Sequence, residues 1–233
     1  ALEDGCKSML IVTISTAAAG IIVGSVDMTG IGNSLGTAFS NLAGGHLFLG
    51  LVMAMVLAFI LGAGMPTTPA YIVQVATVIP ALVAMGLPEH VAHMFAFYYS
   101  CLSLISPPVA AAAFTAAAIA GSDGWKTGWV ATRIGLVAFV VPFMFAYDQT
   151  LMMEGPALDV ALDMISACLG AASFALAGVG FLFRRQTWLE RILAFAAGLL
   201  LVFPEKLYSL AGLGLLCLLL IPQLAARRRQ RSA

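Results

Sequence analysis

The feature that most constrains this chain is the lack of charge between Asp27 and Glu89, where no Asp, Glu, Lys or Arg occurs. Such a run is typical of a segment that lies in a lipid bilayer, where a charged side chain is costly. Its middle nevertheless reads GAGMPTTP, from Gly62 to Pro69, which does not suit an uninterrupted spanning helix. Because lipid offers no hydrogen bonds, broken backbone at this depth must be satisfied by protein or by a water-filled cavity.

A second interruption, Ser106-Pro107-Pro108, divides the next apolar segment, 89–121. Proline has no N–H, so carbonyls in the preceding turn lose their hydrogen-bond partners. Two interrupted apolar segments are the best indication, in a sequence, of a substrate or ion site in a secondary transporter. The alternatives are a plain loop at the first interruption and a proline kink that only shapes packing at the second.

The composition agrees with a membrane protein. The chain is 61% hydrophobic and 9% charged, whereas about 25% of the residues in a soluble domain are charged. Its formal net charge of zero gives no reason to expect a nucleic acid partner. The four cysteines form no CxxC pair, and no His or Cys cluster has zinc spacing, so we expect neither a transition metal nor a cofactor. No triad, nucleotide loop or carboxylate pair suggests catalytic residues, so we do not expect an enzyme.

The apolar segments predict an all-α membrane protein. Residues 8–26 are long enough for a span, and 27–45 read as an amphipathic helix lying in the interface. Residues 47–61 and 70–86 are shorter: 15 residues make a helix of about 22 Å, against a hydrocarbon core of about 30 Å. We therefore expect 47–86 to form a re-entrant hairpin, with two tilted full spans as the alternative.

The remaining segments predict a broken helix and several spans. They are the broken helix over 89–121, and spans over 127–147, 158–183, 188–203 and 207–225. We divide the chain into a region of transporter type, 1–150, and a C-terminal extension, 151–233, with about three membrane helices. Within the first region, the segments follow in the order of span, interfacial helix, re-entrant hairpin, broken helix and span.

Basic residues set the expected orientation, because cytoplasmic loops carry an excess of Lys and Arg. Arg227, Arg228, Arg229 and Arg231 place the C-terminus in the cytoplasm. Counting back through the spans puts the other basic clusters on the same side, with Lys206 as the exception. If residues 47–86 crossed the membrane only once, the predicted orientation would be reversed only for the residues that precede them.

The uncharged tip at Gly62–Pro69 is the strongest candidate for an ion or substrate site. Unwound carbonyls and threonine hydroxyls are oxygen ligands suited to Na⁺, and helix N-termini attract anions. Thr68 stands directly before Pro69, which predicts a helix N-cap at Thr68 with proline at the first helical position.

Other polar residues carry weaker hypotheses. His90 and His93 stand beside Glu89, where they form either a metal or proton site or, more simply, a solvated helix end. Asp123 is expected to be a helix-end charge. Arg133 is expected to reach the cytoplasmic headgroups, with a buried partner as the alternative.

Four stretches carry a resemblance to a known family. They are LGAGMPTTPAYI (Leu61 to Ile72), SPPVAAAAFTAAAIAG (Ser106 to Gly121), the pattern of Thr127, Gly128, Trp129, Ala131 and Arg133, and VPFMFAY (Val141 to Tyr147). Over about residues 5–150 the chain resembles the second half of the large membrane subunit of TRAP transporters, the tripartite ATP-independent periplasmic carriers of bacteria and archaea. Pro66, where many large subunits have Asp, resembles the fused-permease branch associated with TAXI-type binding proteins.

The resemblance implies Na⁺-driven uptake of a small organic anion, usually a carboxylate, which a periplasmic binding protein delivers to the cytoplasmic (inner) membrane. It also implies two inverted repeats, with a transport domain that moves against a scaffold. The positions that would line one Na⁺ site and the substrate cavity are Gly62, Gly64, Met65, Thr67, Thr68, Ser103, Ser106, Pro107 and Pro108.

The chain departs from the family in lacking the first repeat and the small-subunit helices. We therefore expect it to be the C-terminal part of a fused permease, with the missing permease half and the small-subunit helices as partners besides the lipid bilayer. Two other functions stay open: a different ion-coupled carrier with inverted repeats, and an accessory membrane subunit that does not transport. Dependence of uptake on Na⁺ and on a binding protein would separate them.

Overall fold

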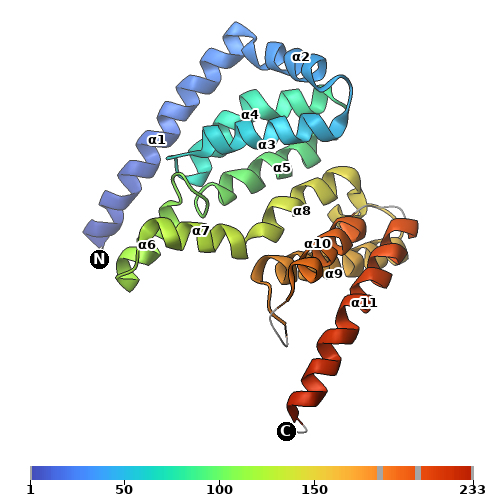
Figure 1. Ribbon diagram of the computed structural model, residues 1–233. Helices are drawn as coiled ribbons and strands as arrows, with labels where there is room; N and C mark the ends of the chain where they lie inside the picture. Colours follow the sequence, from blue (N-terminus) through green and yellow to red (C-terminus); the bar gives the residue numbers. More distant parts are fainter. Residues whose placement is uncertain (1, 183–185, 203–205, 232–233) are drawn as a thin grey trace. The chain divides into compact units, whose positions relative to one another are not determined.

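A computed structural model describes residues 2–182, 186–202 and 206–231 (Figure 1). In these ranges the chain forms α-helices and one short 3₁₀ helix, and no strand, which confirms the prediction of an all-α protein. The helices gather into two compact units, residues 1–131 and 132–233. The expected division into a transporter region, 1–150, and an extension, 151–233, stays a prediction.

Helix α4 (Thr67–Ala84) is the centre of the first unit. It packs against α1 (Leu2–Thr29), α2 (Ile31–Ala43), α3 (Leu47–Gly62) and α5 (Glu89–Leu102). Its sequence is apolar on all sides, a pattern typical of a helix enclosed by others or by lipid. Accordingly, Ala70, Val78, Ala81 and Leu82 are fully buried.

The amphipathic helix expected over 27–45 corresponds to α2, which the glycines Gly30 and Gly44 bound in left-handed conformations. The side chains of Phe39 and Ala43 are buried, whereas Leu42 is 70% exposed. Since α2 packs on α4, the buried side of α2 faces its neighbour through Phe39 and Ala43.

Residues 47–86, the predicted re-entrant hairpin, contain a pair of helices. Helices α3 and α4 lie side by side and are joined by residues 63–66 (Figure 1). Helix α4 is long and apolar enough to cross a membrane, whereas α3 is a shorter apolar helix. Whether the pair enters and leaves on one side of the bilayer stays a prediction.

The predicted break in 89–121 is also present. Helix α5 ends at Leu102, and α6 (Ala111–Ala120) begins after eight residues without regular helix. The last turn tightens, because the N–H of Leu104 donates to the carbonyl of Cys101 at 3.3 Å. Across the break, the N–H of Ala112 donates to the carbonyl of Leu104 at 3.0 Å. The broken segment is thus held by its own backbone.

Helix α7 (Gly124–Ile134) follows, and Asp123 caps its start, as the sequence suggested. The Asp123 carboxylate accepts a hydrogen bond of 2.7 Å from the backbone N–H of Lys126. Gly128 lets α7 approach the break: a Cβ atom there would stand 3.3 Å from Cγ of Pro107 and 3.4 Å from the ring of Phe114.

The single span expected over 127–147 is wrong in one respect. The helix is interrupted at Gly135, where α7 ends and α8 (Leu136–Tyr147) begins. Together the two pieces are apolar and long enough for one broken span or a re-entrant segment. Among the described residues, two helices could cross a membrane by length and composition, or three if this pair counts as one span.

The second unit contains α8, the 3₁₀ helix η1 (Gln149–Met152), α9 (Ala157–Val179), α10 (Trp188–Val202) and α11 (Lys206–Arg231). Helix α10 packs against both α9 and α11. Glycines permit the close approach: a Cβ atom at Gly198 would stand 3.1 Å from the ring of Phe174, and one at Gly212 would stand 2.7 Å from Cγ of Leu201. Small residues at helix contacts are typical of membrane proteins.

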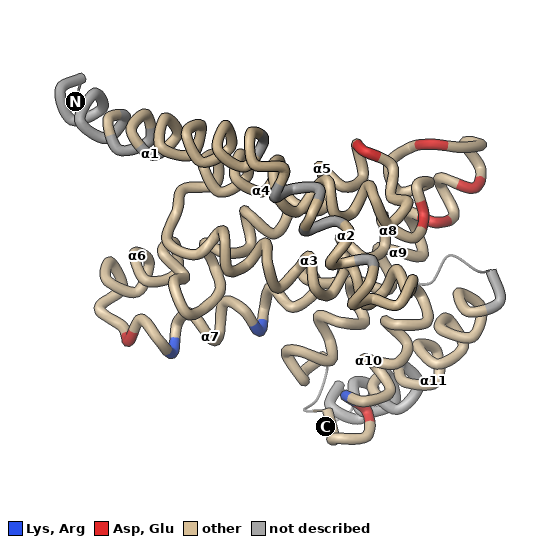
Figure 2. Tube along the Cα trace, turned by 90° about the horizontal axis from the view of Figure 1, so that it is seen from above, with Lys and Arg blue, Asp and Glu red and all other residues tan. Residues whose placement is uncertain are grey.

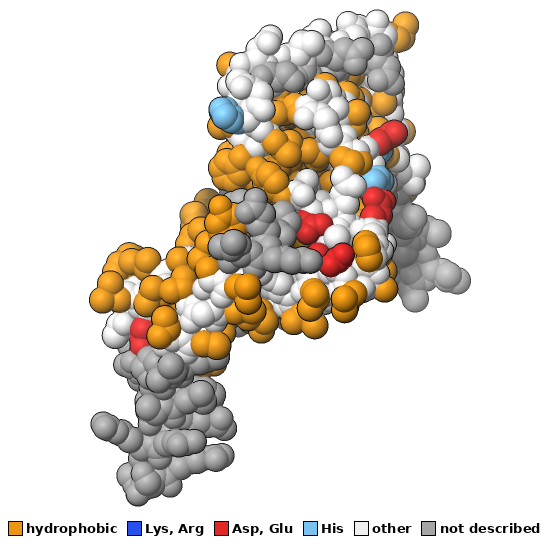
Figure 3. All heavy atoms as spheres, turned by 90° about the vertical axis from the view of Figure 1, so that its right-hand side faces the viewer, with side chains coloured by type: hydrophobic (Ala, Val, Ile, Leu, Met, Phe, Trp, Pro, Cys, Tyr) orange, Lys and Arg blue, Asp and Glu red, His pale blue; other side chains and the backbone are white. Residues whose placement is uncertain are grey.

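The surfaces of both units carry many exposed hydrophobic side chains. Examples are Ile60, Ile119, Leu162 and Phe195, which are exposed by 65%, 85%, 50% and 43%. Figure 3 shows such side chains spread over the face of the molecule that it draws. In the second unit, four acidic residues lie in or beside the loop between α8 and α9, whereas Glu190 lies on α10 (Figure 2). An apolar surface with charge confined to helix ends is what a bilayer requires.

Candidate functional site

The uncharged tip lies between α3 and α4. Gly64 has a left-handed backbone, with φ at 81°, which a residue with a side chain rarely adopts. Helix α4 begins at Thr67, after Pro66. The predicted N-cap at Thr68 is therefore wrong, because the N-cap is Pro66, two residues earlier, and Pro69 is the third residue of the helix. The first backbone N–H groups of a helix have no acceptor within that helix. Proline, which has no N–H, is therefore tolerated at both Pro66 and Pro69.

The end of α3 meets the break after α5. The hydroxyl of Ser103 lies 3.2 Å from the carbonyl oxygen of Gly62 and 2.8 Å from that of Ser100, so its one proton is shared between them. A Cβ atom at Gly62 would stand 2.9 Å from this hydroxyl and 3.1 Å from Cβ of Ser103. Only glycine allows so close an approach. Two residues named from the sequence are thus brought together.

Gln74, on α4, completes this contact. Its side chain is fully buried. Its amide nitrogen donates to the carbonyl of Ala58 at 3.2 Å and to the hydroxyl of Ser100 at 3.0 Å. That hydroxyl in turn donates to the carbonyl of Ala96 at 3.0 Å. The amide orientation follows from these contacts, because the reverse orientation would set the Gln74 oxygen against a carbonyl oxygen.

The hydrogen bonds of Gln74 and Ser103 connect helices α3, α4 and α5 to one another. Gln74 links α4 to α3 and to α5, and Ser103 links the end of α5 to α3. Two side-chain oxygen atoms, Oε1 of Gln74 on α4 and Oγ of Ser106 in the break after α5, are buried without a hydrogen-bond partner. A buried polar group without a partner is costly and asks for an explanation, such as an ion or a ligand. Both atoms are neutral oxygen ligands.

The other predicted site residues lie on the two interruptions. At the tip, Met65 and Thr67 are half-buried, and Gly64 and Thr68 are exposed. At the break, Pro107 is half-buried and packs towards α7, and Pro108 is exposed. Within the described residues, the hydroxyls of Thr67 and Thr68 form no hydrogen bond.

Gln74 and Ser100 were missed in the sequence. The signal was present for Gln74, because it is the one amide in an otherwise apolar run with few polar residues, AYIVQVATVIPALVAMG. A buried amide in a membrane helix commonly forms hydrogen bonds to neighbouring helices, and polar residues at this depth can mark a functional site. Ser100 gave no signal, since a serine in a membrane helix commonly bonds to its own backbone.

The histidines form no metal centre in the described part of the chain, where no group of three potential metal ligands occurs. Nδ1 of His93 lies 2.6 Å from the hydroxyl of Tyr71, and its Nε2 lies 3.9 Å from the carboxylate of Glu89. This arrangement joins α4 to α5 near an exposed helix end. Whether these residues have a function beyond this helix contact stays a prediction.

Comparison with known proteins gave one match. The family model described as "Tripartite ATP-independent periplasmic transporter, DctM component" matches residues 1–153. Neither the curated proteins nor the solved structures contain a match to the chain. The matched range includes both interruptions and every residue of the buried network.

Proposed function

The chain belongs to the DctM family of tripartite ATP-independent periplasmic transporters, and from this premise we propose that it is part of a Na⁺-coupled importer of an organic anion. Its family is one of transporter permeases and not of enzymes. The apolar helices fit a multi-pass protein embedded in a membrane. The anion is proposed to be a carboxylate that a periplasmic binding protein delivers.

The observation that carries the proposal is that two side-chain oxygens, one on the helix after the tip and one in the break, are buried without a hydrogen-bond partner. Oε1 of Gln74 and Oγ of Ser106 are neutral, and Na⁺ is bound by neutral and charged oxygen atoms alike. The free hydroxyls of Thr67 and Thr68 at the tip add two further oxygen ligands. In this proposal, Na⁺ binding satisfies oxygens that otherwise stay without partners.

The substrate anion would be held at the tip by dipoles instead of charge. Residues 28–88 contain no Lys or Arg, so the tip offers no cation for a salt bridge. The N-terminus of α4, which begins at Thr67, carries a partial positive charge that favours an anion. Such a site recognises carboxylates as a class.

We further propose that the chain represents the C-terminal part of a fused permease of the TAXI-type branch, which works in the cytoplasmic membrane with the first repeat and the small-subunit helices. The departure from the Asp found in many large subunits, at Pro66, supports this branch. The basic residues at the C-terminus support its cytoplasmic location.

The experiment is uptake by the assembled transporter, reconstituted in liposomes with its binding protein, at a series of Na⁺ concentrations. Thr67→Ala and Thr68→Ala should each raise the Na⁺ concentration needed for half-maximal uptake, because each removes one oxygen ligand. Thr77→Val is the matched control, since its buried hydroxyl bonds to the carbonyl of Val73 at 2.9 Å. Unchanged Na⁺ dependence in both alanine variants would remove the threonines from the site, and uptake without Na⁺ would overturn the coupling.

A further inference from the structure

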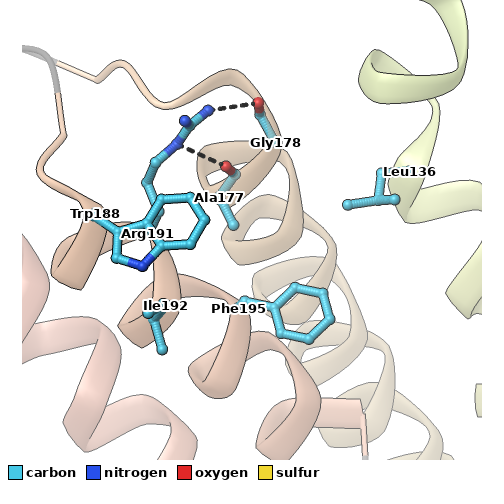
Figure 4. A pocket seen from close by; sticks show the side chains of 7 residues that line it. All are labelled: Leu136, Ala177, Gly178, Trp188, Arg191, Ile192 and Phe195. Atoms are coloured by element: carbon cyan, nitrogen blue, oxygen red, sulfur yellow. Dashed lines mark hydrogen bonds between the residues drawn. The ribbon is translucent and has the colours of Figure 1, made fainter. Parts of the chain in front are cut away.

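The C-terminal end of α9 collects two arginines from different helices. Gly180 ends the helix in a left-handed conformation, with its N–H bonded to the carbonyl of Leu176 at 2.8 Å. Nε of Arg133 donates to the carbonyl of Gly178 at 2.7 Å. Arg191, on α10, donates to the carbonyls of Ala177 at 3.2 Å and Gly178 at 3.0 Å (Figure 4). Cations at this end of a helix are favoured by its dipole.

The hydrogen bonds to the end of α9 use only some of the N–H donors of these two arginines. Arg133 donates through Nε alone, which leaves its two terminal nitrogens, and Arg191 leaves one. No carboxylate in the described part of the chain pairs with either guanidinium. Two positive charges therefore stand close together without a counter-charge.

The unused donors border a polar cavity of about 450 Å³, which is lined by Arg133, Val179, Gly180, Phe181, Gln186 and Arg191. Both polar atoms of the Gln186 side chain are buried without a hydrogen-bond partner. Its backbone is fixed, since the N–H of Gln186 donates to the carbonyl of Gly180 at 2.9 Å. The cavity thus presents guanidinium and amide groups that have no hydrogen-bond partner among the described residues.

An apolar groove of about 260 Å³ adjoins this cavity and shares Arg191 with it. Its walls are Leu136 from α8, Ala177 and Gly178 from α9, and Trp188, Ile192 and Phe195 from α10 (Figure 4). Trp188 is 73% exposed at the first position of its helix, as tryptophans at a membrane interface commonly are. The polar cavity with its two arginines therefore lies next to the apolar groove.

We propose that this composite pocket binds an anionic phospholipid. The phosphate would lie between Arg133 and Arg191, because planar guanidinium groups donate paired hydrogen bonds to phosphate oxygens. The amide of Gln186 would contact the rest of the headgroup, and one acyl chain would follow the apolar groove. Basic pockets between membrane helices on the cytoplasmic side are suited to such headgroups.

A free phosphate would explain the polar cavity and leave the apolar groove without a role. A neutral lipid would fill the groove and leave two arginines without a counter-charge. Charge and apolar shape together favour one ligand class.

The test titrates the protein, purified in detergent, with dioleoyl-phosphatidylglycerol, dioleoyl-phosphatidylcholine or inorganic phosphate, and counts bound ligand by native mass spectrometry. The anionic lipid should bind about tenfold more tightly than the zwitterionic one, the difference expected for one charge-assisted hydrogen bond or more. Arg133→Gln with Arg191→Gln should abolish this preference, whereas Arg191→Lys should keep part of it.

Lys126→Gln is the matched control, because it removes one charge from an exposed residue outside the pocket. Should the double variant fail to fold, Trp188→Ala serves instead, since this exposed side chain forms a groove wall. Trp188→Ala should weaken both lipids and keep the preference for the anionic one. Equal affinity for the two lipids, an equal loss in Lys126→Gln, or competition by inorganic phosphate at lipid-like concentrations would each overturn the proposal.

Discussion

Replacing Gln74 by leucine should separate packing from transport. The two side chains are similar in size, so the change leaves little cavity or strain. It removes two hydrogen bonds, to Ala58 and to Ser100, each worth about 0.6 kcal/mol between membrane helices. It also removes the buried oxygen without a partner, and such a group costs about 1–3 kcal/mol.

These opposing effects nearly cancel. Losing the two hydrogen bonds lowers the free energy of unfolding by about 1.2 kcal/mol, and removing the unpartnered oxygen raises it by a similar or larger amount. The free energy of unfolding should therefore stay the same or rise by less than about 2 kcal/mol. Ser100 is not orphaned, because its hydroxyl keeps its bond to Ala96. Na⁺-driven uptake, in contrast, should be lost, because the variant has no oxygen to offer the ion.

Two measurements on the same preparation decide the matter: unfolding in mixed micelles by a denaturant series, and uptake in liposomes as a function of Na⁺. Thr77→Val is the control, a buried polar residue one turn away on the same helix. The reasoning is refuted if Gln74→Leu transports normally. It is refuted equally if stability falls by more than about 3 kcal/mol, since the amide would then be mainly structural.

Two further outcomes follow from the fold. Cysteines placed singly at His46 and Gly86, both exposed, should be labelled by a membrane-impermeant reagent from the outer side if 47–86 is re-entrant, and labelling from opposite faces would show two full spans instead. Gly62→Ala should cost about 1–3 kcal/mol of stability through overpacking, because its Cβ atom would stand 2.9 Å from the serine hydroxyl that faces it; a melting temperature equal to that of the unmodified protein would show that the helices can separate freely.

The sequence was sufficient for the local features of the fold. Pro107 and Pro108 lack a backbone N–H, which predicted the break, and the glycines around residue 64 predicted the tip. Both predictions succeeded because they depend on the backbone chemistry of a few neighbouring residues. Helix boundaries near proline were less secure: Pro66 and Pro69 both suit the start of a helix, and the earlier one proved to precede it.

Long-range contacts were not accessible in the same way. Gly62 and Ser103 were both named from the sequence, yet nothing in their own segments indicates that they touch. Their pairing depends on how three helices pack, and so does the role of Gln74. The interruption at Gly135 was missed for a different reason, since glycine is common in continuous membrane helices and does not by itself mark an end.

The network around Gln74 also limits which parts of the protein can move. Turning the hairpin away from α5 would break the bonds from Gln74 to Ser100 and from Ser103 to Gly62 in a medium without water to replace them. Helices α3, α4 and α5 should therefore travel as one rigid body. Left-handed glycines stand at both ends of that body and its continuation in α6, at Gly44 and Gly45 before α3 and at Gly121 after α6. A conformational change should therefore move the proposed ion site together with these three helices instead of separating them.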